Sequence, residues 1–110
     1  MVLYNEEHTT PSVGDNLLEK TAVRISNRNR VIMKLAYTGG SAIADGEVEI
    51  YVGSTKVANL RNNATTTNYV ENDNIWAAGQ IFVPRGVQVS AVVTVAAAAN
   101  YNLLIDFKDM

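Results

Sequence analysis

The chain has 110 residues, of which 47% are hydrophobic and 18% charged, and its formal net charge is −2. This length predicts a single domain spanning residues 1–110, and the composition is that of a globular protein. The weak net charge excludes a strong general attraction to nucleic acid or anionic lipid. The absence of cysteine excludes disulfides, thiolate metal sites and cysteine nucleophiles.

The N-terminal sequence MVLYNEEHTT has acidic residues where a signal peptide would have basic ones, and no apolar run follows it. The longest apolar stretch, residues 87–99, is interrupted by Gln88, Ser90 and Thr94. A stretch so short and so polar predicts no membrane span.

Alternation of apolar and polar residues with period two predicts most of the chain to be β-strand. An edge strand is expected at residues 2–5 and a weaker strand at residues 17–26, which contain Val23 and Ile25. The stronger patterns follow at residues 30–38, 47–52, 56–61, 80–83, 87–95 and 101–108. Residues 62–74 form a polar loop, and the four alanines at 96–99 are expected to be a loop rather than a helix.

Turn residues separate these segments at Gly39-Gly40, Asp45-Gly46, Gly53-Ser54-Thr55 and Pro84-Arg85-Gly86. Seven or eight short strands at such intervals predict an all-β fold, an antiparallel β-sandwich and in particular a jelly roll. The long polar loop suits a Greek-key crossover between the sheets.

Several predicted strands carry apolar residues on both faces. In residues 30–38, Val31, Met33, Leu35 and Tyr37 share one face, and Ile32 lies opposite them. Second-face apolar residues would be exposed to water in a monomer, which suggests a partner. The predicted oligomer interface comprises Ile32, Val92 and Leu104.

Few residue patterns offer catalysis, and no catalytic, cofactor or metal residue is predicted. His8 is the sole histidine and is expected to be an exposed spectator, because zinc sites need more nitrogen or sulfur ligands. Glu47 and Glu49 share a strand face and are the residues that a small glycoside hydrolase would use. An outward pair of this kind is more typical of a solvated surface. The oxygen-rich residues 71–74 are a minority option for calcium, without EF-hand spacing.

One region of the chain is basic. No acidic residue occurs between Thr21 and Thr38, and the candidates for a weak phosphate or nucleic-acid contact are Arg24, Arg28, Arg30 and Lys34. The competing interpretation is a charged sheet edge that resists unwanted strand pairing.

Aromatic residues flank the polar loop, at Tyr69 and Trp76. With residues 71–74 they are candidate glycan contacts, because sugar-binding β-sandwiches stack aromatic rings on sugars. The competing interpretation is that Trp76 anchors the core.

Two stretches carry a resemblance to a known class. The hairpin DGEVEIYVGSTKVANLR at residues 45–61, and residues 74–110 with the corner VPRG, a valine-rich strand, an alanine loop and a terminal strand, resemble the small jelly-roll virion proteins of bacterial and archaeal viruses. The resemblance implies a capsid, penton, cement or decoration subunit that forms homo-oligomers and contacts other virion proteins. It implies a location in the virion, assembled in the host cytoplasm; without it a cytoplasmic protein is expected. A carbohydrate-binding module is the alternative.

Overall fold

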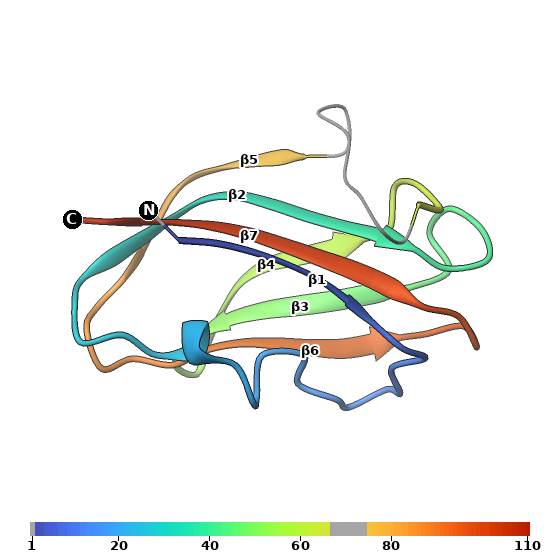
Figure 1. Ribbon diagram of the computed structural model, residues 1–110, viewed down its shortest axis with the longest axis horizontal. Coiled ribbons are helices and arrows are strands. Elements are labelled where there is room, and N and C mark those ends of the chain that lie inside the picture. The colour runs from blue at the N-terminus through green and yellow to red at the C-terminus, as the bar shows by residue number, and fades with distance from the viewer. Residues whose placement is uncertain (1, 67–74) are drawn as a thin grey trace.

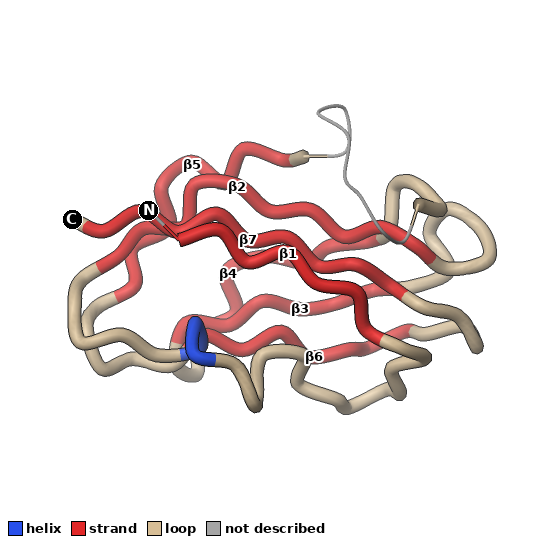
Figure 2. The backbone as a smooth tube through the Cα atoms, viewed as in Figure 1, coloured by secondary structure: helices blue, strands red, loops and turns tan. Residues whose placement is uncertain are grey.

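The computed structural model describes residues 2–66 and 75–110. Within these residues seven strands occur: β1 (Val2–His8), β2 (Arg30–Gly39), β3 (Glu47–Val52), β4 (Thr55–Arg61), β5 (Trp76–Val83), β6 (Val89–Val95) and β7 (Tyr101–Asp109). A single turn of 3-10 helix, η1 (Ala22–Arg24), lies in the long connection between β1 and β2. Figure 2 shows how much of the backbone is strand.

The strands form two antiparallel sheets that pack face to face (Figure 1). One sheet has the order β1-β7-β2-β5 and the other has the order β4-β3-β6. Residues 14–17 run beside the outer edge of β6, where the amide of Gly14 donates to the carbonyl of Val93 and the amide of Leu17 donates to that of Ala91. Counted as a rudimentary eighth strand, this segment completes the strand order of a jelly roll, as the sequence predicts.

The core lies between the two sheets. Tyr101, Leu103, Ile105 and Phe107 of β7 are all fully buried, as strict alternation requires. The Tyr37 and Tyr101 rings stack at a centroid distance of 5.2 Å. The opposite sheet contributes Val48, Ile50, Val89, Ala91 and Val93. The alternation therefore identifies the inward face of β3 and β7 correctly.

Two bulges invert faces that strict alternation would assign. Ile32 pairs with Phe107 and Lys34 with Asp106, so Met33 is an extra residue in β2. Ile32 therefore joins Leu35 and Tyr37 in the core, and the predicted position of Ile32 on the opposite face is wrong. In β6 the extra residue is Thr94, because Glu47 pairs with Val95 and Val48 with Val93. Val95 is consequently exposed.

Residues 17–26 do not form the predicted strand. The side chain of Asn16 accepts hydrogen bonds from the amides of Leu18 (3.1 Å) and Ala91 (3.0 Å), which bends the chain at this point and attaches it to β6. Leu17 and Leu18 are buried in the core, whereas Ile25 is exposed. Of the predicted polar loop, residues 62–66 are irregular, as expected, and residues 67–74 lie outside the described residues.

A buried amide organises the turn before β3. Asn62, 1% exposed, donates from Nδ2 to the carbonyls of Gly39 and Ala42 at 2.8 Å each and accepts the amide of Gly46 at 2.9 Å. Gly40 has φ +79°, and a Cβ there would run into Asp45 and Asn62. Only glycine therefore fits this position.

Candidate functional site

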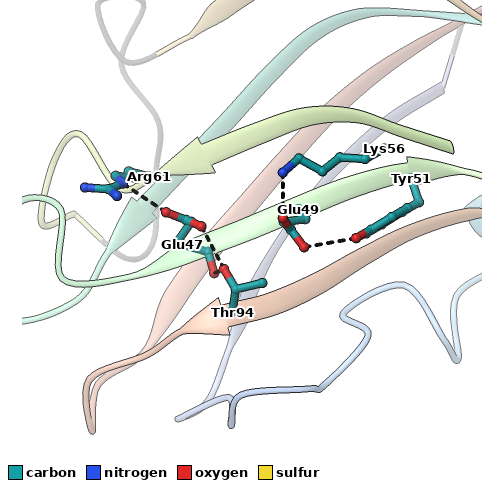
Figure 3. Close-up of polar contacts among 6 residues, drawn as sticks. All are labelled: Glu47, Glu49, Tyr51, Lys56, Arg61 and Thr94. Carbon is teal, nitrogen blue, oxygen red and sulfur yellow. Dashed lines mark hydrogen bonds and ion pairs between the residues drawn. The ribbon is translucent and has the colours of Figure 1, made fainter.

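The outer face of the three-stranded sheet carries a row of paired polar side chains, drawn in Figure 3. Glu47 accepts from Arg61 Nε and from Thr94 Oγ1, both at 3.0 Å. Glu49 accepts from Lys56 Nζ at 2.7 Å and from the Tyr51 hydroxyl at 3.0 Å. Both glutamates point outward, as the sequence predicts.

These contacts define the charge state of the two glutamates. The hydrogen bond from Thr94 is the largest influence on the pKa of Glu47 and lowers it; burial raises this pKa, and the hydrogen bond and charge of Arg61 lower it further, so that the net direction is downward. The hydrogen bond from Lys56 lowers the pKa of Glu49 in the same way. A glycosidase needs one carboxyl group with a raised pKa to act as general acid. The arrangement supplies two ionised carboxylates and no such acid.

The three predicted interface residues lie in three different environments. Ile32 is fully buried in the core and is wrong as an interface residue, because the bulge at Met33 turns it inward. Leu104 faces outward from the four-stranded sheet as expected but is only 6% exposed. Val92 lies on the outer face of the other sheet, opposite Glu49, and is half-buried. The structure does not bring them together.

The predicted basic residues differ in exposure, although Arg28 and Arg30 line the same open cavity. Arg24, Arg28 and Lys34 are exposed. Arg30 is 3% exposed, with its guanidinium carbon 4.4 Å from the centroid of the Phe107 ring and Nη1 donating to the Val23 carbonyl at 2.7 Å. Arg30 shares the inward face of β2 with Ile32 and is largely buried, and its role as a phosphate contact stays a prediction. The Arg30 side chain closes one end of the core.

Of the predicted glycan contacts, only Trp76 can be placed. It begins β5, pairs with Leu35 and is 38% exposed, so it does not belong to the buried core. Tyr69 and residues 71–74 lie outside the described residues. The predicted calcium ligands, residues 71–74, therefore also lie outside the described residues.

The outer face of the four-stranded sheet carries an apolar side chain on each of its strands, among charged and polar ones. Leu3 of β1 and Phe82 of β5 are 59% and 48% exposed. Val31 of β2 pairs with Phe82, and Leu104 of β7 pairs with Ala36. Asp106 lies opposite Leu3, and Lys108 lies opposite Val31. This face therefore exposes apolar side chains from both edge strands. The sequence predicts apolar residues on a second face, but it does not predict that these residues are the exposed ones.

A groove follows the free edge of β1, and the sequence did not indicate it. Open cavities of about 420 and 490 Å³ adjoin there, both lined by Tyr4, Glu6, Lys20 and Thr21. At one end the Tyr4 hydroxyl lies 2.8 Å from His8 Nε2, and burial lowers the pKa of His8. The prediction of His8 as an exposed spectator is wrong, because alternation in β1 points it to the same side as Tyr4.

Among residues 2–66 and 75–110, no three histidine, aspartate or glutamate side chains are grouped so that they could hold a metal ion. No helix in the same part of the chain is long and apolar enough to cross a membrane. Comparison with protein-family models, with curated protein sequences and with solved structures finds no match to this chain.

Proposed function

We propose that the protein is a structural subunit of a virus or phage particle, in a capsid, cement or decoration role, and that it assembles with copies of itself. The observation that carries this proposal is the pair of exposed apolar side chains on the outer face of the edge strands β1 and β5, with Leu3 59% and Phe82 48% exposed. Fully burying a side chain of this size contributes roughly 1.5–3 kcal/mol, so a partner surface here would be stabilising.

The charge distribution supports the same proposal. Only 18% of the residues are charged, and the net charge is −2. Copies of such a chain repel one another weakly, since long-range repulsion scales with net charge. The jelly-roll fold agrees with a virion role by analogy, because viral capsid domains use it, although lectins share it.

The test measures the oligomeric state by light scattering at increasing protein concentration. The wild type is expected to form oligomers, and the double variant Leu3→Ser/Phe82→Ser is expected to be a monomer. The matched control is Val13→Ser/Ile43→Ser, which removes two side chains of 65% and 67% exposure from loops and should assemble like the wild type. A wild type that stays monomeric at millimolar concentration and joins no virion shell contradicts the proposal.

A carbohydrate-binding module is the second candidate, and one observation favours it. Trp76 is 38% exposed at the start of β5 instead of filling the core. A partly exposed indole offers the flat apolar surface that a sugar ring stacks on. A weak nucleic-acid contact through Arg24, Arg28, Arg30 and Lys34 stays a prediction.

A further inference from the structure

We propose that the free edge of β1 binds an extended, basic segment of a partner protein as an additional strand of the four-stranded sheet. This inference does not rest on self-assembly through Leu3 and Phe82, since β1 presents its backbone edge and its outer side chains in different directions.

The edge of β1 is open for pairing. β1 is the terminal strand of its sheet and pairs with β7 alone. In the part of the chain that the structure describes, no further backbone hydrogen bond involves residues 2–8. A strand of seven residues offers roughly 20 Å of edge, along which alternate residues point amide and carbonyl groups outward.

The other edges are less suited to receive a strand. The edge of β6 already pairs with residues 14–17. The register of β5 is interrupted between Ile81 and Ala77, and Gln80 has φ +65°. β4 is bulged, because Ile50 pairs with Ala58 and Tyr51 with Lys56. β1 instead pairs with β7 in unbroken register from Val2 to His8, which leaves its free edge regular.

The groove beside β1 has room for the side chains of an added strand. Its two cavities share Tyr4, Glu6, Lys20 and Thr21 and continue one another, from His8 and Thr9 at one end to Leu3 and Val23 at the other. The opposite wall is the segment 15–23, which the bond from the Leu17 amide to Ala91 attaches to the other sheet. The β1 residues that line the groove therefore run from Leu3 to His8.

The charge of the groove indicates that the segment it binds is basic. Its lining includes three carboxylates, Glu6, Asp15 and Glu19, against the single ammonium group of Lys20. The two ion pairs found within the described residues, Lys56–Glu49 and Arg61–Glu47, involve none of these four. A basic segment would neutralise the lining. The β1 strand of a second copy would instead add its own Glu6 and Glu7, so we infer a different protein.

The first test uses a fluorescein-labelled seven-residue peptide of alternating lysine and valine, with anisotropy as the readout. Two further versions carry N-methyl groups either on all lysine amides or on all valine amides. The amides of one set face β1 and those of the other face solvent, so one version should lose binding and the other should keep it. Equal binding by both versions, loss by both, or no binding of the parent peptide overturns the proposal.

The second test uses two neighbouring glutamates of β1. Glu6 lies on the groove side with Tyr4, whereas Glu7 lies on the outer face opposite Asn102. Glu6→Gln should weaken peptide binding about two- to fivefold at low salt, the range for single exposed charge pairs, and Glu7→Gln should have a smaller effect. Equal effects would mean general charge attraction without the groove and would overturn the proposal. Thermal unfolding of both variants checks that the fold is intact.

Discussion

The Tyr101 hydroxyl donates a hydrogen bond of 2.9 Å to Oδ1 of Asp45, across 56 residues of sequence. Oδ2 of the same carboxylate accepts the amides of Ser41 and Ala42 at 2.8 and 2.9 Å. Because the Tyr101 ring is fully buried, this contact joins the turn before β3 directly to the core. The folding of the turn and of the core should therefore be coupled.

This coupling predicts a loss of stability in acid. Burial raises the pKa of Asp45, but the hydrogen bonds from Ala42, Ser41, Tyr101 and Asn62 together lower it below its ordinary value of 3.8. Since the folded-state pKa is the lower one, the stabilisation is complete above pH 3.8 and is lost as the pH falls through the folded-state value.

The measurement is thermal unfolding from pH 7 to pH 2. Asp45→Asn should be less stable than the wild type at pH 7 and should lose less stability on acidification. A residual slope is expected, because Glu47 and Glu49 also have lowered pKa values. Parallel curves for the variant and the wild type would contradict the prediction.

Asn62→Ala should destabilise the fold by about 2–4 kcal/mol, because it leaves the carbonyls of Gly39 and Ala42 and the amide of Gly46 without their partner. Urea unfolding gives the free-energy change. The control is Asn27→Ala in an exposed turn, which should stay within about 0.5 kcal/mol of the wild type. A similar loss of stability in both variants would contradict the role of the Asn62 side chain in organising the turn.

The position of Ile32 can be tested against that of Val92. Ile32→Ala should cost about 2–5 kcal/mol, the usual range for a large side chain removed from a core. Val92→Ala should cost about 1 kcal/mol or less, since Val92 is half-buried on the outer face. Chemical unfolding of the two variants measures both losses of stability. A larger loss for Val92→Ala than for Ile32→Ala would contradict the position of the bulge at Met33.

The carbohydrate alternative makes its own prediction. If Trp76 stacks on a sugar, glycan-array binding should be present in the wild type and absent in Trp76→Ala. Phe82→Ala is the control, because it removes an exposed aromatic side chain from the outer face of the same strand. A silent array for the wild type, or equal loss in both variants, would count against the module.

The strands could be predicted because their signal is local. Alternation within residues 101–108 depends only on neighbouring residues, and all four inward side chains of that strand are fully buried. The bulges at Met33 and Thr94 could not be predicted in this way, because an extra residue is defined by its partner strand. Each bulge places a side chain, Ile32 or Val95, on the face opposite to the one that strict alternation assigns.

The groove beside β1 could not be predicted from the sequence for the same reason. The groove depends on the path of residues 15–23, and that path is held by contacts between Asn16 and Ala91, 75 residues apart. Leu17 and Leu18 are apolar in sequence whether they lie in a strand or a turn, so their pattern did not reveal the bend. His8 was misassigned because its partner, Tyr4, is recognisable only once both lie on one strand.

The bulge in β2 also bears on how this domain tolerates changes in length during evolution. Ile32 faces inward, Lys34 outward and Leu35 inward, with Met33 alone outside the alternation. A chain that lacked Met33 would keep every other side chain of β2 on its present face. Deletion of Leu35 or Ala36 instead would reverse the faces of the residues on one side of the gap. Met33 is thus a point at which a central strand can lose a residue while the core keeps its composition.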